Sequence, residues 1–193
     1  MKKTLLALVT LSSLGMASSV MAAAGDAMPV GTASFQWAGT VPTATNPGAG
    51  YFIIQEGDTN FTDGVLTFTN IASGGVKLNG SNEIGFKVVK DKADDGPYKP
   101  ADDVTPLPYK GTLTSIKVGI NGFVSEQVTD GYFNIFADSQ KLVVNTADSI
   151  NKSAANNITR LTVKPKDANA NADLNASDAV VVQALIAVNP TDV

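Results

Sequence analysis

Hydrophobic and polar residues alternate along this chain with a period of two. Short apolar runs, rich in β-branched and aromatic residues, recur between clusters of turn-forming residues. Such runs are typical of strands, and no long helical period interrupts them in the first 140 residues. The pattern therefore predicts an all-β sandwich. Its expected strands are 51–54, 65–68, 84–89, 113–120, 132–136, 141–144, 158–163 and 180–188.

Turn-forming residues separate these runs. Asn121-Gly122 is a strong signal for a tight hairpin turn, and Asp63-Gly64 and Asp130-Gly131 are similar. Residues 91–110 contain four prolines and five aspartates, so we expect an exposed loop there rather than a strand. Tyr98 and Tyr109 in this stretch are candidates for a shallow ligand contact, or are simply surface residues.

The first 22 residues have the pattern of a secretory signal peptide. Lys2 and Lys3 precede an apolar run, and small residues follow up to Ala22, where cleavage fits the small-x-Ala rule. We therefore predict that the chain is secreted through the periplasm. The remaining 171 residues carry 12 basic and 18 acidic side chains, a net charge of −6.

The composition excludes several kinds of chemistry. The chain has no cysteine and no histidine, so disulfides, thiol nucleophiles and imidazole catalysis are impossible. An acidic chain is also a poor partner for nucleic acid. A pair of carboxylates is the remaining route to hydrolysis, but the glutamates are few (Glu56, Glu83 and Glu126) and none stands in an apolar setting. We expect neither enzymatic activity nor a cofactor.

An amphipathic strand is predicted close to the N-terminus. One face of this segment carries five residues, because side chains alternate along an extended chain. It also contains the chain's single tryptophan. This strand either belongs to the domain's own sheets or acts as a donor strand that fills a groove in another subunit. Its five residues on one face are Ala33, Phe35, Trp37, Gly39 and Val41.

The last predicted strand has a matching pattern. Val180, Val182, Ala184, Ile186 and Val188 share one face of it. Its other face is also largely apolar, which suits a strand buried between neighbours. Exposed, such a strand would promote aggregation, so we expect a folded neighbour, a chaperone or another subunit to cover its edge.

These two ends of the chain resemble a known family. The segment Phe35-Gln-Trp37-Ala-Gly39-Thr-Val41-Pro42 and the tail from Ala172 to Val188 are similar to the ends of major subunits in the coli surface antigen five group of chaperone–usher fimbriae. That group also lacks the usual pilin disulfide.

The resemblance implies an immunoglobulin-like (pilin) sandwich that lacks its last strand. Residues 23–42 would be an N-terminal extension, and 43–193 the pilin domain. A periplasmic chaperone would first fill the gap, and at the outer-membrane usher the donor strand of another copy would replace it. The five residues 33–41 named above would be the donor residues, and the five at 180–188 would flank the inserted strand. The product would be a cell-surface fimbria that supports adhesion to host surfaces, with a tip adhesin and a host receptor as further partners.

One alternative stays open. Oxygen-bearing side chains stand at positions 1, 3, 5, 7, 9 and 12 of residues 167–178, which resembles a dockerin-type calcium loop. Position 6 is Ala172, where the sharp turn of such loops needs glycine. The alternative reading is a secreted monomeric β-sandwich binding domain with this weak calcium site. Its candidate ligands are Asp167, Asn169, Asn171, Asp173, Asn175 and Asp178.

Overall fold

Antiparallel strands make up the regular structure of the described chain, which contains no helix. A computed structural model describes residues 50–71, 75–93 and 97–191. No helix in this part of the chain is long and apolar enough to cross a membrane. The all-β prediction is confirmed. The predicted signal peptide, the N-terminal extension and the five candidate donor residues all lie outside the described residues.

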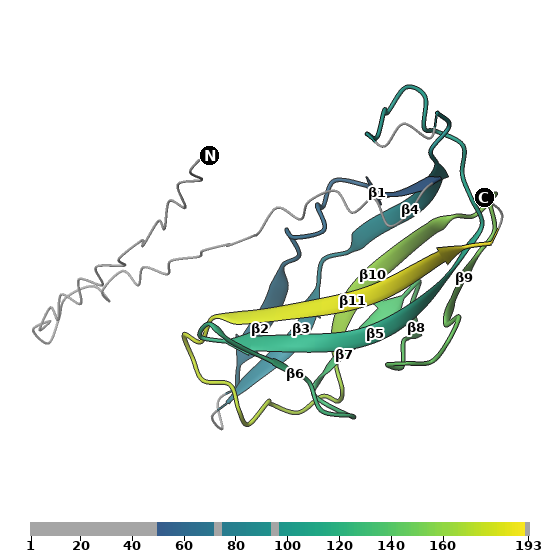
Figure 1. The fold of residues 1–193 in the computed structure, drawn as a ribbon. Helices are drawn as coiled ribbons and strands as arrows, with labels where there is room; N and C mark the ends of the chain where they lie inside the picture. Colours follow the sequence, from purple (N-terminus) through teal and green to yellow (C-terminus); the bar gives the residue numbers. More distant parts are fainter. Residues whose placement is uncertain (1–49, 72–74, 94–96, 192–193) are drawn as a thin grey trace, which may run out of the picture. The chain divides into compact units, whose positions relative to one another are not determined.

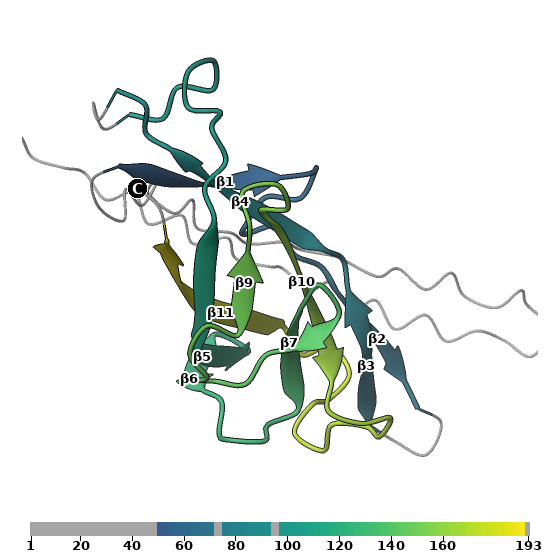
Figure 2. The same cartoon turned by 90° about the vertical axis from the view of Figure 1, so that its right-hand side faces the viewer.

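The strands form three sheets (Figure 1). The first has the order β1-β4-β10-β7-β8, with β1 Tyr51–Glu56, β4 Ile84–Lys90, β10 Ile158–Pro165, β7 Phe133–Ala137 and β8 Gln140–Lys141. The second has the order β11-β5-β6, and β9 also pairs with β5; here β11 is Val180–Pro190, β5 Tyr109–Ile120, β6 Phe123–Glu126 and β9 Ile150–Lys152. The third is the pair β2 Leu66–Asn70 and β3 Val76–Ser81, which lies near β10 in Figure 2.

The main core lies between the first two sheets. Phe86 and Val88 of β4 pack with Leu113 and Ile116 of β5, and Ile135 of β7 joins them. At its centre, the Tyr109 hydroxyl lies 2.6 Å from the Thr159 hydroxyl, and both residues have no exposed surface. This hydrogen bond satisfies two polar groups that burial would otherwise leave unpaired.

A β-bulge in β5 aligns its buried face with β11. Leu185 pairs with Ser115 and Ile186 with Leu113, so Thr114 is an extra residue on β5. Its hydroxyl donates to the carbonyl of Leu185 at 3.0 Å. The bulge shifts the inward face of β5 from odd to even positions along the strand, whereas β11 alternates without interruption.

Most predicted strands are confirmed, with shifts of a few residues at their ends. The prediction of a strand at 141–144 is wrong beyond Lys141, because the chain turns there: Thr146 N–H donates to the carbonyl of Val143. Three short strands, β3, β6 and β9, were not predicted. The predicted Asn121-Gly122 turn is confirmed, since both residues have positive φ and join β5 to β6.

In its described residues, 91–93 and 97–108, the proline-rich stretch has no regular strand before β5 begins, as expected, but it is not simply exposed. Asp103 is 1% exposed and its carboxylate accepts the backbone N–H groups of Lys92 and Lys99. Tyr98 packs edge-on against Phe52 of β1. The interpretation of Tyr109 as a surface contact is wrong: β5 begins at this residue, and its ring is part of the core.

Candidate functional site

The long strand β11 lies at the margin of its sheet. It pairs with β5 from Val180 to Pro190. Among the described residues, no strand pairs with its other edge (Figure 1). An edge strand presents a row of unpaired backbone N–H and C=O groups, so it can serve as a template for another strand. Natural proteins usually shorten or charge such edges, but β11 has eleven residues and none of them is charged.

The core beside this edge is only partly covered. Leu161 and Val163 face inward from β10, the middle strand of the five-stranded sheet, yet both are only half-buried. Val118 and Ile120 of β5 are half-buried as well, whereas Leu113, on the same strand, is fully buried. Inward residues of interior strands are normally enclosed by the facing sheet. The two sheets therefore enclose one part of the core and leave another part open.

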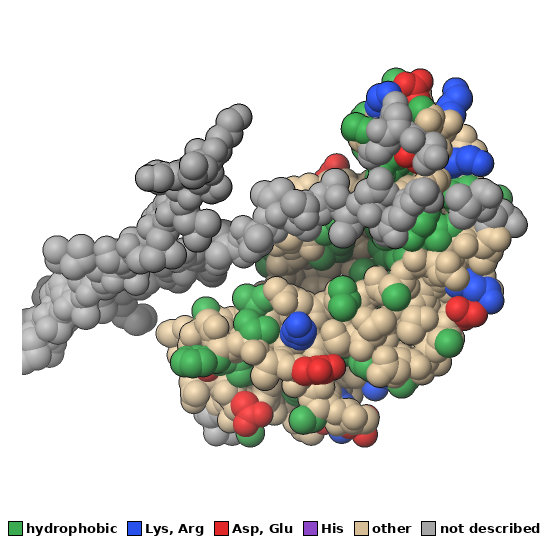
Figure 3. Space-filling view, in the orientation of Figure 1, with side chains coloured by type: hydrophobic (Ala, Val, Ile, Leu, Met, Phe, Trp, Pro, Cys, Tyr) green, Lys and Arg blue, Asp and Glu red, His purple; other side chains and the backbone are tan. Residues whose placement is uncertain are grey.

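We call this open region the β11 groove. Its walls are β11 on one side and the edge strands β1 and β2 on the other, and hydrophobic side chains are visible in a hollow here in Figure 3. All the residues that define it pack against the core without being fully buried. They are Tyr51, Ile53, Leu66, Phe68, Val118, Ile120, Leu161, Val163, Val180, Val182, Ile186 and Val188.

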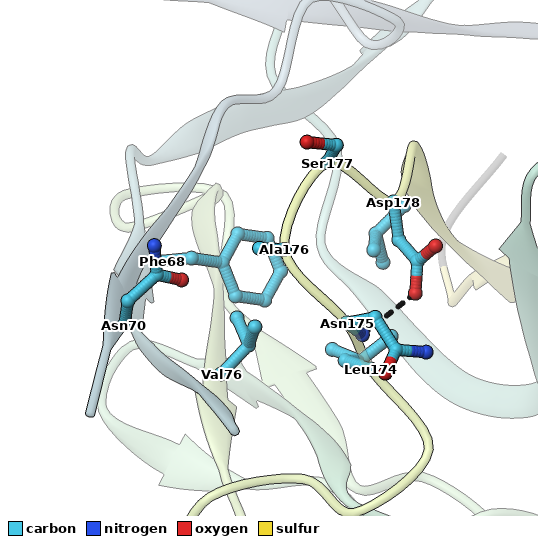
Figure 4. A pocket seen from close by; sticks show the side chains of 9 residues that line it. Phe68, Asn70, Val76, Leu174, Asn175, Ala176, Ser177 and Asp178 are labelled. Atoms are coloured by element: carbon cyan, nitrogen blue, oxygen red, sulfur yellow. Dashed lines mark hydrogen bonds between the residues drawn. The ribbon is translucent and has the colours of Figure 1, made fainter. Parts of the chain in front are cut away.

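A small pocket lies at the end of the groove where β11 begins. It has a volume of about 120 Å³. Phe68 of β2 and Val76 of β3 point toward the loop that precedes β11 (Figure 4), and Leu174 and Val180 complete its apolar lining. The pocket has room for one modest aliphatic side chain.

A hydrogen bond joins the two walls at the other end of the groove. The Tyr51 hydroxyl of β1 donates to the carbonyl of Val188 on β11 at 3.2 Å. A tyrosine hydroxyl keeps its proton at neutral pH and can donate, and burial raises the pKa of Tyr51 further. We call this contact the Tyr51 clasp.

The five predicted acceptor residues share one face of β11, as the alternation indicated. Val180, Val182, Ile186 and Val188 are half-buried against the core. Ala184 lies between them and is exposed. Its partner on β5 is Ile116, which is buried in the core, so Ala184 also faces the groove.

The opposite face of β11 is open to solvent. Val181 is 47% exposed and Leu185 is 63% exposed. Within the described residues β11 has one neighbouring strand, and no second sheet covers its outer face. The expectation that a chaperone or another subunit covers its edge stays a prediction. The apolar composition of this strand is not explained by burial within the described residues.

The candidate calcium residues use their oxygens to order the loop. The carboxylate of Asp167 accepts the N–H of Asn169 at 2.8 Å, and the side-chain carbonyl of Asn171 accepts the N–H of Asp173 at 2.9 Å. Across the part of the chain that the structure describes, no three His, Cys, Asp or Glu side chains gather into a group that could hold a metal ion. Asp167 and Asn171 each form an Asx turn.

Asp178 fastens this loop to the β5–β6 turn. Its carboxylate accepts the backbone N–H of Asn175 and the side-chain amide of Asn121, each at 2.7 Å. Asn121 also accepts the N–H of Ala179 at 3.0 Å. The hydrogen bond from the Asn175 backbone, followed by the one from Asn121, lowers the pKa of Asp178. These contacts fix the point at which β11 begins.

Comparisons of this chain with protein-family models, with curated proteins and with solved structures found no match.

Proposed function

We propose that this protein is a structural subunit of a bacterial surface fimbria and polymerises by strand donation. The segment 33–41 of one copy would insert along the free edge of β11 in the next copy. The two main sheets would then be an immunoglobulin-like sandwich that lacks one strand, and the donor would complete it.

The edge of β11 that has no partner among the described residues carries this proposal. An uncharged strand of eleven residues lies beside a half-open core, and its groove-facing residues alternate with the period of a strand. A strand added to such an edge gains main-chain hydrogen bonds along its length, and alternate side chains fill the space below. The missing component is therefore a strand with apolar residues at every second position, and the segment 33–41 has this pattern.

Strand donation by one end of a chain to the groove of another copy produces a fibre. The contact joins two different surfaces, so it repeats head to tail and does not close. Before assembly, the exposed groove needs a temporary occupant, and a periplasmic chaperone strand would fill that role until the subunit reaches the outer-membrane usher. Adhesion to a host surface would follow from the fibre or from an adhesin at its tip.

The first test is self-complementation. Residues 31–42 are fused behind Val193 through a short flexible linker, in the chain that lacks residues 1–22, and thermal unfolding is measured. We expect the fused chain to be a stable monomer, and the unfused chain to aggregate or to unfold at a much lower temperature. A matched control carries Trp37→Asp in the fused copy only, which places a charge in the apolar groove and should remove the stabilisation.

The opposite result would overturn the proposal. If the unfused chain is already a stable monomer and the fused segment changes nothing, then the groove needs no strand. In the natural chain, Trp37→Asp or Gly39→Trp should abolish fibres and leave chaperone binding intact, because only the donor segment is altered. Fibres of wild-type appearance from either variant would show that 33–41 is not the donor.

A further inference from the structure

The β11 groove has two marked ends. At one end the Tyr51 clasp brings β1 onto Val188. At the other end the loop 174–178 closes the small pocket beside Val180. The part of β11 between these ends is the stretch Val180–Val188, nine residues by their numbers. At roughly 3.4 Å per residue it is about 27 Å long.

The segment 33–41 has the same length. It also has nine residues, and it places five side chains on one face, as Val180–Val188 does toward the groove. A shift by one residue would turn its apolar face to solvent. A shift by two residues would carry one end past the Tyr51 clasp or into the loop 174–178. A strand that fills the whole groove therefore has one register.

In this register, the same two central residues face each other whichever way the donor strand runs. Whether the donor runs parallel or antiparallel to β11, its central residue lies opposite the central residue of Val180–Val188. The central residues are Trp37 and Ala184. Ala184 is the smallest of the five acceptor side chains and the exposed one, so it fills less of the groove than the other four do.

We infer that Trp37 of one copy lies over Ala184 of the next, and that this contact of a large side chain with a small one fixes the donor register. The inference rests on the proposed function and adds to it which residues face each other. Facing large and small side chains fill a gap between strands without overlap, whereas two large ones would collide. A larger residue at position 184 should therefore clash with Trp37 and weaken binding of the donor strand.

The test uses the self-complemented chain with the native Trp37 replaced by Phe, so that the fused copy holds the single indole. Ala184→Leu is compared with Ala187→Leu, which makes the same change on the outer face of the same strand, where Ala187 is exposed. We expect Ala184→Leu to remove most of the stabilisation that the fused segment gives, and to shift the tryptophan emission toward that of an exposed indole. We expect Ala187→Leu to leave both unchanged.

A rescue completes the test. Trp37→Ala in the fused segment should restore much of the unfolding temperature lost in Ala184→Leu, because it makes room for the leucine. Each variant is also measured without the fused segment, where Ala184→Leu should unfold as the parent does. If the fused segment stabilises the chain but the two leucine variants behave alike, the register is wrong and the fimbrial function stands. If the fused segment gives no stabilisation at all, the proposed function fails.

Discussion

β5 and β11 are the two longest strands of the described chain, and they pair with each other over most of their length, yet they differ in what covers them. The second edge of β5 is occupied by β9 at its start and by β6 at its end. The second edge of β11 has no partner among the described residues. Leu113 of β5 is fully buried, whereas Ile186, its partner on β11, is half-buried.

The comparison separates two reasons for an apolar strand. The hydrophobic residues of β5 are accounted for by the core that they form, and its solvent side carries polar residues such as Lys117. β11 also carries hydrophobic residues that do not contribute to the described core, such as the exposed Val181 and Leu185. A long apolar strand at an open edge exposes a protein to aggregation unless something covers it, and the proposed donor strand would provide that cover.

The largest expected effect comes from opening the closed part of the core. Leu113→Ala should lower the free energy of unfolding by about 3 kcal/mol, because it leaves a cavity in a tightly packed region. Ile186→Ala, at the paired position on β11, should cost about 1 kcal/mol, since solvent already reaches that side chain. Urea unfolding of both variants measures the difference.

In the self-complemented chain, the two substitutions should differ less in their effect on the free energy of unfolding. Once a strand covers the groove, Ile186 is enclosed as Leu113 is, and the cost of Ile186→Ala should approach that of Leu113→Ala. If Ile186→Ala lowers the free energy of unfolding by the same amount with and without the fused strand, the groove stays open.

A smaller effect should appear at alkaline pH. Burial raises the pKa of Tyr109 to about 12, against a small opposing effect of its hydrogen bond to Thr159. The unfolded chain ionises near pH 10, so the stability that the neutral, buried tyrosine provides is complete below pH 10 and is lost as the pH rises to about 12.

Tyr109→Phe isolates this effect. The variant should be less stable at neutral pH by about 1–2 kcal/mol, because the buried Thr159 hydroxyl loses its partner. Between pH 10 and pH 12 it should lose less stability than the parent does, since one titrating group is gone. Circular-dichroism melting curves across this range are the measurement, and parallel losses in the two proteins would contradict the assignment.

The smallest effect concerns the start of β11 at acid pH. The lowered pKa of Asp178 means that its carboxylate stabilises the folded state at neutral pH, and that this contribution is lost as the pH falls below the usual aspartate range. Asp178→Asn should melt slightly below the parent at pH 7, and the difference in melting temperature should narrow as the pH falls to 3. Thermal melting at both values tests this, with Asp167→Asn as the control in the same loop. A constant gap between Asp178→Asn and the parent would count against the role of the charge.

The sequence predicted the strands of this fold better than their arrangement. Alternation was sufficient to predict the strands at Val180–Val188 and in β4 and β10, because successive side chains of a strand point to opposite faces and apolar ones mark the buried face. The position of β11 at a sheet margin could not be read in this way, since sheet order depends on pairing between distant segments. The apolar run after Lys141 was misleading because Leu142 is buried directly after the short strand β8, and the chain then turns at 144–145.

Two features of the site were not found from sequence. The Tyr51 clasp joins residues 137 positions apart, and no feature of the neighbouring sequence predicts it. The β3 strand had a signal in the alternation of Val76 and Leu78, but it was not among the predicted strands. Tyr109 was assigned to the proline-rich loop because Pro106 and Pro108 precede it, although a strand can begin directly after a proline.

Because of the bulge at Thr114, β5 should tolerate the loss of one residue, whereas its partner β11 should not. Deleting Thr114 would remove an extra residue and leave both strands with a regular ladder. Deleting a single residue within Val180–Val188 would instead move every following side chain to the other face of β11. During divergence, one-residue insertions and deletions can therefore accumulate in β5 near the bulge, whereas β11 is expected to change by substitution and to keep its length.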